Sequence, residues 1–337
     1  MNISNIFRHS SRKLIFGGIG ILIFVIILGL LFFMPPSEPI WGISFSQKVS
    51  TEMGLDWRAT YDAILSDLGA HNLRIATYWN MLEPSPSTYA WEDLDYQVRA
   101  AEKAGAKLTL ALGRKTPRWP ECHMPDWVAA LPIEHQQAAL LDMLRAVVSR
   151  YKDSLALERW QVENEPFLGF GGCSLWAESF LDREIAAVRE LDPAHKIVVT
   201  DSGELSMWWR IARHGDLVGV TMYRRVWSDV FHRYVTFPIP AAWYELKAIL
   251  ARIFSNKSVI NVELQAEPWG NGLPSSVTPE NERQTMSPEI FESNLDYARR
   301  TSLSEVYLWG AEWWYFKKTV QNNSAYWDLA RPLFESK

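Results

Sequence analysis

The most constraining feature of this sequence is a regular alternation of short apolar runs with amphipathic helical patterns, which begins at Trp41 and continues almost to the last residue. Runs that stay apolar throughout and are separated by helical segments are typical of parallel strands buried on both faces. Eight such runs occur in order: WGISFS, NLRIATY, KLTLALG, LERWQVE, KIVVTDS, DLVGVTMY, SVINVEL and EVYLWG. The alternation therefore predicts eight strand–helix pairs.

Eight pairs within residues 41–337 match an α/β protein of the (β/α)₈ TIM-barrel class, which typically takes about 250 residues plus loop insertions. A doubly wound open sheet usually has fewer strands and often carries a glycine-rich phosphate loop. Neither GxGxxG nor GxxxxGK occurs in the chain. We therefore expect a closed barrel.

Residues 14–33, ahead of the predicted barrel, are 20 consecutive apolar or glycine residues. A helix of that length rises about 1.5 Å per residue and spans about 30 Å, the thickness of the hydrocarbon core of a bilayer. Arg8, Arg12 and Lys13 precede the stretch, and residues 34–40 contain no lysine or arginine. By the positive-inside rule, this asymmetry keeps the N-terminus in the cytoplasm.

The sequence thus predicts a cytoplasmic basic N-terminus at residues 1–13 and a single transmembrane signal anchor at residues 14–33. A linker at residues 34–40 would connect the anchor to a catalytic domain at residues 41–337, exposed to the extracellular space or the periplasm. The alternative is a cleaved signal peptide, which would normally have an apolar region of about 7–15 residues and a small-residue cleavage site.

The chain contains only two cysteines, Cys122 and Cys173. In an oxidising compartment two cysteines commonly form a disulfide, and the predicted barrel places both in neighbouring loops. The alternative is two unrelated buried thiols.

Polar and aromatic side chains stand at the carboxyl ends of the predicted strands, where the catalytic groups of TIM barrels lie. These residues are Arg74, Asn164, Glu165, Tyr223, Glu263 and Trp309. Glycoside hydrolysis needs two carboxyl groups, one protonated and one ionised. An arginine and a tyrosine can keep one carboxylate charged, and an asparagine and a tryptophan suit a sugar ring. This set therefore has the chemistry of a glycosidase.

Two segments resemble the retaining glycoside hydrolases of clan A, the barrel enzymes that include cellulases, mannanases and β-galactosidases. One is NEP after the fourth strand, followed about 100 residues later by a glutamate at the seventh. The other is LRIATYWNMLEPSPSTYAWEDLDYQVRAAEKAGAKLTLAL, in which Ser87 replaces the family's glycine. The resemblance covers residues 41 to about 333, almost the whole predicted barrel.

The resemblance implies a role for each of these residues. Glu165 would be the acid/base and Glu263 the nucleophile. The residues that would support the nucleophile or bind the sugar are Arg74, Asn164, Tyr223 and Trp309.

Several assignments have alternatives. Glu267 lies four residues after Glu263 and is the other candidate nucleophile; if Glu263 has that role, Glu267 would bind a substrate hydroxyl or another loop. Glu163 is expected to face the helices or to form a salt bridge. Trp269, Trp313 and Trp314 are candidates for outer sugar subsites or for packing.

We therefore expect a membrane-anchored retaining glycosidase acting on β-linked oligo- or polysaccharides without a cofactor. No metal site is expected, because the seven histidines show no HxxxH spacing and no CxxC occurs. Nucleic acid is not an expected partner, since the net charge is -5 and no basic block is present. The alternatives are a transglycosylase that uses the same site and a tethered carbohydrate-binding protein on an inactive barrel.

Overall fold

The computed structural model describes residue 29 and residues 37–335, apart from residues 170, 229–230 and 271. The predicted basic N-terminus, and the predicted anchor apart from residue 29, lie outside the described residues. Within the described part of the chain, no helix combines the length and the hydropathy needed to cross a bilayer. The anchor at residues 14–33 therefore stays a prediction.

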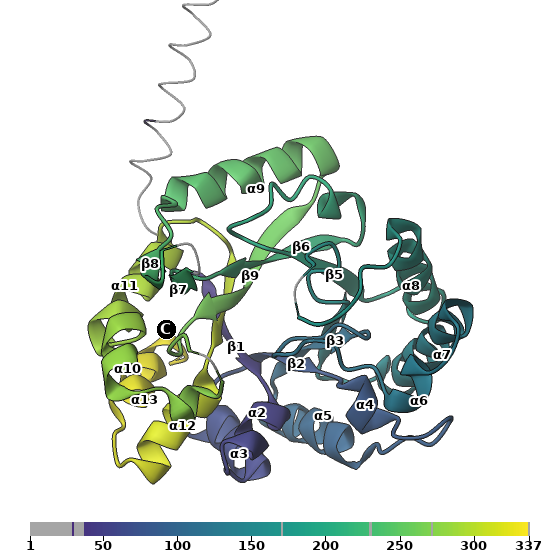
Figure 1. Cartoon of the computed structure of the whole chain (residues 1–337), viewed down its shortest axis with the longest axis horizontal. Helices are drawn as coiled ribbons and strands as arrows, with labels where there is room; N and C mark the ends of the chain where they lie inside the picture. Colours follow the sequence, from purple (N-terminus) through teal and green to yellow (C-terminus); the bar gives the residue numbers. More distant parts are fainter. Residues whose placement is uncertain (1–28, 30–36, 170, 229–230, 271, 336–337) are drawn as a thin grey trace, which may run out of the picture.

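Eight parallel strands close into a barrel, which confirms the predicted TIM-barrel fold (Figure 1). Their order around the barrel is β1-β10-β9-β6-β5-β4-β3-β2. The strands are β1 (Ile40–Phe45), β2 (Asn72–Ala76), β3 (Lys107–Leu112), β4 (Leu157–Val162), β5 (Lys196–Asp201), β6 (Leu217–Met222), β9 (Ser258–Gln265) and β10 (Glu305–Trp309).

Helices surround this barrel, and short helices also occupy several loops that follow strands (Figure 1). The longer helices are α3 (Trp57–Ser66), α5 (Glu92–Ala104), α7 (Ile133–Tyr151), α8 (Glu178–Leu191), α9 (Ala241–Ser255), α11 (Pro288–Arg299) and α12 (Ala311–Val320). The shorter ones are α2 (Gln47–Glu52), α4 (Trp79–Leu82), α6 (Asp126–Ala129), α10 (Pro279–Thr285) and α13 (Ala325–Ala330), with 3₁₀ turns η1 (Ile211–Arg213), η2 (Pro274–Ser276) and η3 (Arg331–Leu333).

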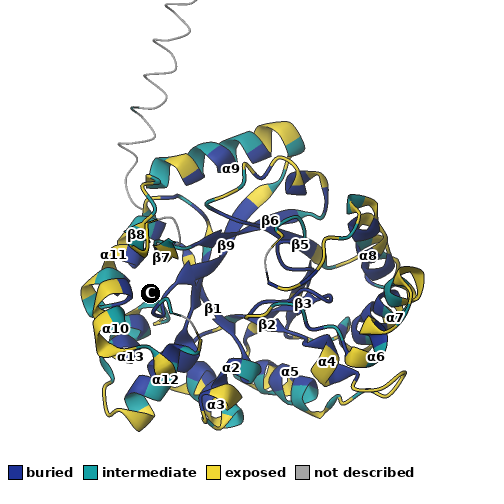
Figure 2. Ribbon diagram, viewed as in Figure 1, coloured by how far each residue is buried: buried dark blue, intermediate teal, exposed yellow. Residues whose placement is uncertain are grey.

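The barrel strands are buried along nearly their whole length, because helices cover their outer face and side chains fill the interior (Figure 2). Local signals set the ends of the helices. Gly105 ends α5 in the left-handed conformation, with φ 65°, and the Ser287 side chain accepts the Ile290 backbone N–H at the start of α11.

Three connections differ from the predicted alternation. The β5–β6 connection carries the 3₁₀ turn η1 where a short helix was predicted, and the β6–β9 connection begins with a hairpin of β7 (Arg225–Ser228) and β8 (Arg233–Thr236). Helix α12 follows β10 at once and was not predicted. It begins after Gly310, which has no side chain to cap a helix, so the usual sequence signal for a helix start is absent.

The loop after β5 approaches β6 so closely that only glycine fits at residue 203. A Cβ atom on Gly203 would lie 1.7 Å from the backbone oxygen of Thr221 and 2.7 Å from the Tyr244 hydroxyl. The Gly203→Ala variant is therefore expected to lose about 1–3 kcal/mol of unfolding free energy, measured by chemical denaturation. The matched control is Gly169→Ala, whose Cβ would meet its nearest neighbour at 3.8 Å. Equal stability of the two variants would contradict the prediction.

Candidate active site

Most of the predicted site residues lie at or just beyond the carboxyl-terminal ends of the barrel strands. Arg74 is in β2, Asn164 and Glu165 follow β4 directly, and Tyr223 follows β6. Trp309 is the last residue of β10. Glu263 is in β9, the seventh barrel strand, which runs two residues past it, so the strand ends slightly later than the sequence suggested.

Arg74 is the centre of the site and is 1% exposed. Its Nη1 donates to Glu263 Oε1 at 2.8 Å, its Nη2 to Asn164 Oδ1 at 2.8 Å, and its Nε to Gln161 Oε1 at 2.7 Å. A single buried guanidinium therefore joins residues from β2, β4 and β9.

Glu263 is held at both carboxylate oxygens. Besides the ion pair with Arg74, its Oε2 accepts the Tyr223 hydroxyl at 2.8 Å. Burial, together with the adjacent Glu263 charge, raises the pKa of Tyr223 well above its ordinary value, so the hydroxyl keeps its proton and stays a donor. A cationic donor and a hydroxyl donor both stabilise the negative charge of this carboxylate.

Glu165 lies in a different environment. It is 6% exposed, and its carboxyl group accepts only a long hydrogen bond from the Thr221 hydroxyl, 3.5 Å from Oε1, among the described residues. Burial raises the pKa of Glu165 well above its ordinary value, and the charges of Glu263 and Glu121 raise it further. The site therefore combines a carboxyl group that favours its proton with one whose charge is stabilised.

Asn164 presents a free donor. Its Oδ1 lies within 2.8–3.3 Å of donors on Arg74, Gln161 and Thr200. These contacts fix the amide so that Nδ2 faces away from them, and among the described residues Nδ2 has no hydrogen-bond partner although it is buried. A buried amide N–H without a partner is unfavourable unless a ligand satisfies it.

One face of the Trp309 ring is covered by Arg118. The Arg118 guanidinium lies 3.9 Å from the centroid of the Trp309 ring, and Arg118 is itself paired with Glu267 and with Glu312, at 3.1 Å for the latter. Trp309 is also 8% exposed, so it presents little surface to a sugar. Glu267 thus binds another loop, one of the two roles considered for it.

The loop after β3 supplies further charged residues at the site. Lys115 Nζ lies 3.0 Å from Glu121 Oε2 and donates to the backbone oxygen of Glu165 at 3.1 Å. A disulfide joins Cys122 in this loop to Cys173 in the loop after β4. The two loops are therefore linked covalently beside Glu165.

Sequence reasoning missed Lys115, Arg118 and Glu121. Their signal was present in GRKTPRWPECH, where charged residues directly follow a buried strand, but no motif distinguishes buried charges in a loop from solvated ones. The expectation for Glu163 was also incomplete, because its carboxylate accepts two backbone N–H groups of this same loop.

The tryptophans considered as outer subsites have different environments. Trp313 and Trp314 are 1% and 0% exposed and pack in the core, so they do not line a cleft. Trp269 contacts the edge of the Tyr223 ring, with centroids 5.5 Å apart, and is the one of the three beside the site. Within the described ranges, no cluster of His, Cys, Asp and Glu could hold a metal ion.

No family model matches the chain. A mannan endo-1,4-beta-mannosidase F of Aspergillus fumigatus is 29% identical over an alignment of 152 residues that covers 37% of this chain and 32% of that protein. The mannan endo-1,4-beta-mannosidase A of Aspergillus aculeatus is 26% identical over 174 residues, 42% of this chain and 45% of that protein. The chain spans less than half the length of the curated relatives it matches.

Solved structures share the fold. GH5_18 from Streptomyces cattleya, in complex with GlcNAc, has a TM-score of 0.59 and 15% identity, covering 82% of this chain and 71% of its own. A GH10 endoxylanase from a sugarcane soil metagenome has a TM-score of 0.56 and 14% identity, covering 81% of this chain and 86% of its own. The mannosidase relatives and these barrels confirm the resemblance to clan A glycoside hydrolases, without assigning one family.

The surroundings of Glu165 predict the effect of removing the Glu121 charge. A nearby negative charge disfavours ionisation, so Glu121→Gln is expected to lower the pKa of Glu165. The measurement is a pH titration of ¹³C-labelled glutamate carboxyl resonances, with the Glu165 signal identified by its loss in Glu165→Gln. The control Glu121→Asp keeps the charge and should leave most of the shift in place. A Glu165 pKa that does not fall in Glu121→Gln would contradict this prediction.

Proposed function

We propose that the chain is a retaining glycosidase that hydrolyses β-linked glycans by double displacement. The observation that carries the proposal is the contrast between two buried glutamates. Glu263 accepts from Arg74 and Tyr223, which stabilise a carboxylate, whereas burial and neighbouring charges favour the protonated form of Glu165. Opposite protonation states of two carboxyl groups are what this reaction requires.

In the first step, the Glu263 carboxylate attacks the anomeric carbon and forms a glycosyl ester. The glycosidic C–O bond breaks at the same time, and the leaving oxygen takes the proton of Glu165. Formation of the ester removes the charge of Glu263, one of the causes that raise the pKa of Glu165. Glu165 then remains ionised and is ready to act as a base.

In the second step, Glu165 removes a proton from water, and the resulting oxygen nucleophile attacks the anomeric carbon from the face that the leaving group vacated. The ester bond to Glu263 breaks, and the sugar leaves with its original anomeric configuration. Arg74 and Tyr223 again stabilise the released carboxylate.

The proposed substrate class is a β-1,4-linked mannan-type glycan. The curated relatives bear the name mannan endo-1,4-beta-mannosidase, and the chain shares segments of a third to two fifths of its length with them. The unpartnered Nδ2 of Asn164 suits a sugar hydroxyl beside the reacting carbon.

The proposal is tested by hydrolysis of β-1,4-mannan oligosaccharides and activated aryl β-glycosides. Glu165→Gln and Glu263→Gln are each expected to lower kcat/KM on the oligosaccharides by more than about 10³-fold. With Glu263→Ala, azide should form a glycosyl azide of inverted configuration, because azide replaces the nucleophile. Product analysis by ¹H NMR should show that the wild type retains the anomeric configuration.

The matched control is Glu267→Gln, which alters a neighbouring buried carboxylate. Azide rescue of Glu267→Ala instead of Glu263→Ala would assign the nucleophile four residues later. Sugar binding without turnover would favour a tethered carbohydrate-binding protein. Transfer to an added acceptor sugar in preference to water would favour a transglycosylase.

We also propose that residues 14–33 anchor the chain in a membrane and that the candidate site faces away from it. Ile40 begins β1 at the amino-terminal end of the barrel, opposite the carboxyl ends of the strands. The seven residues 34–40 reach at most about 25 Å. The barrel would therefore lie close to the bilayer with its amino-terminal end towards the lipid.

Fractionation tests the anchor. The full chain is expected to stay with membranes after alkaline carbonate washing and to need detergent for release, because residues 14–33 would span the bilayer. The matched control, which lacks residues 1–36, should remain in the soluble fraction. If cells that express the full chain instead yield a soluble product whose N-terminus lies near residue 35, the segment is a cleaved signal peptide.

A further inference from the structure

A second pair of buried glutamates, Glu163 and Glu184, lies between the barrel and α8. We propose that Glu184 is a positioning residue for Glu165: it acts as a neutral carboxylic acid that holds Glu163, and Glu163 in turn fixes the loop that supports Glu165. This inference rests on the proposed glycosidase function and extends it to residues that do not touch the substrate.

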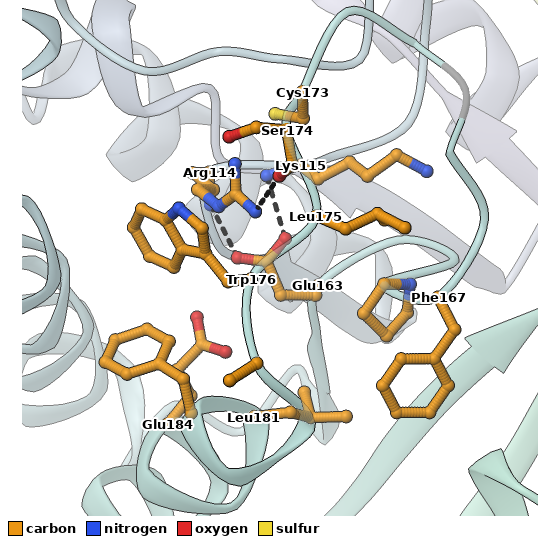
Figure 3. Close-up of a pocket in the computed structure, with 13 residues that line it drawn as sticks. Arg114, Lys115, Glu163, Phe167, Cys173, Ser174, Leu175, Trp176, Leu181 and Glu184 are labelled. Atoms are coloured by element: carbon orange, nitrogen blue, oxygen red, sulfur yellow. Dashed lines mark hydrogen bonds between the residues drawn. The ribbon is translucent and has the colours of Figure 1, made fainter. Parts of the chain in front are cut away.

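Glu163 fastens the loop after β3 to the end of β4. Its Oε1 and Oε2 accept the backbone N–H groups of Arg114 and Lys115, both at 2.9 Å (Figure 3). The turn at Gly113 wraps tightly around the carboxylate, since a Cβ atom there would lie 2.7 Å from Glu163 Oε1. Any displacement of this carboxylate would therefore move the loop.

That loop in turn holds the acid/base. The backbone oxygen of Lys115 accepts the Asn164 N–H at 2.7 Å, and Lys115 Nζ donates to the backbone oxygen of Glu165 at 3.1 Å. Glu163 and Glu165 both have positive φ, 57° and 44°. Non-glycine residues keep this conformation only when surrounding contacts impose it, so the position of Glu165 depends on these bonds.

Glu184 is a buried carboxyl group on an otherwise apolar set of buried residues of α8. The other buried residues on this face of α8 are all apolar: Phe180, Leu181, Ala187 and Val188. An apolar side chain at residue 184 would avoid the cost of burying a carboxyl group. Instead the carboxyl of Glu184 points into a pocket that Glu163 and Trp176 also line (Figure 3). Among the described residues its Oε1 has no hydrogen-bond partner.

The charges around the pocket assign the proton to Glu184. Glu163 accepts backbone N–H groups at both oxygens, and such donors stabilise a carboxylate. Burial, and after it the charge of Glu163, raise the pKa of Glu184 well above its ordinary value, while Arg114 acts in the opposite direction. These two charged groups face Glu184 from the end of β4 and from the loop after β3. Lys115 also lines the pocket, and its Nζ is paired with Glu121. The other buried residues of α8 are apolar.

Loss of that proton would place two carboxylates against each other beside a cavity of about 20 Å³. Glu163 is 4% and Glu184 2% exposed, so solvent would screen the repulsion between two charges there only weakly. The repulsion would loosen Glu163 from Arg114 and Lys115. Glu184 in its neutral form therefore keeps the supporting loop in place.

Infrared spectroscopy tests the protonation of Glu184 without any substrate. The Glu165→Gln/Glu184→Gln double variant at neutral pH is expected to have lost one more carboxylic-acid C=O band than Glu165→Gln alone. An unchanged set of carboxylic-acid bands would overturn the inference. This measurement remains decisive even if other variants at residue 184 fail to fold.

Kinetics of the full chain in detergent test the positioning role. In Glu184→Leu, which cannot donate to Glu163, kcat is expected to fall roughly 10- to 100-fold with KM changed less than about threefold. Glu184→Gln can still donate to Glu163, so it should restore most of kcat. The basic limb of its pH–rate profile should show one ionisation, that of Glu165, whereas the wild type should show two. Glu190→Leu, on an exposed position of the same helix, is the control and should match the wild type.

The outcomes separate the two proposals. If the wild type hydrolyses no glycoside, the proposed function fails, and the infrared result alone decides the state of Glu184. If the wild type is active and Glu184→Leu has the same kcat, the positioning role is overturned while the proposed function stands. A loss in Glu184→Leu that Glu184→Gln does not restore would mean that residue 184 needs an ionisable carboxyl group, which would overturn its role as a neutral donor.

Discussion

The structure of the site depends on one buried cation, the guanidinium of Arg74. Burying a charge costs several kcal/mol unless partners compensate it. Here the compensation comes from the Glu263 carboxylate and from the side-chain oxygens of Asn164 and Gln161, each within 2.8 Å. Because these partners belong to β9 and β4, the requirement to satisfy Arg74 fixes the relative positions of the strands that carry the two candidate catalytic glutamates. The same contacts therefore stabilise the fold and align the site.

Two pairs of buried glutamates in this chain each combine one carboxyl group that has strong donors with one that lacks them. At the mouth of the barrel, Glu263 receives strong donors and Glu165 does not. Behind it, Glu163 receives two backbone donors, and burial leaves the proton with Glu184. In each pair the environment, and not the residue type, decides which carboxyl group is charged. The loop that carries Lys115 contacts both Glu163 and Glu165, and this contact is the basis of the proposed coupling between the two pairs.

The sequence predicted the barrel well because parallel strands buried on both faces leave an apolar signal that no solvated loop imitates. It also predicted Arg74, Asn164 and Glu263 as site residues, since the ends of parallel strands must converge. It could not predict that Arg118 stacks on Trp309, because that contact depends on the path of a loop across the ends of other strands. Helix α12 and the β7–β8 hairpin were missed for a related reason: neither has a capping residue or a turn motif that marks it.

The balance of charge around the mouth bears on the kind of glycan that fits. Arg118 is already paired with Glu267 and Glu312, and Lys115 lies beside Glu121. Burial raises the pKa of Glu312 to about 7, so Glu312 can take up a proton near neutral pH. Arg118 would still be paired with Glu267. An acidic sugar would need an uncommitted arginine or lysine to offset its own desolvation, and these two side chains do not offer one. The pairing of Arg118 and Lys115 is therefore in keeping with the neutral, mannan-type glycan that we propose as the substrate.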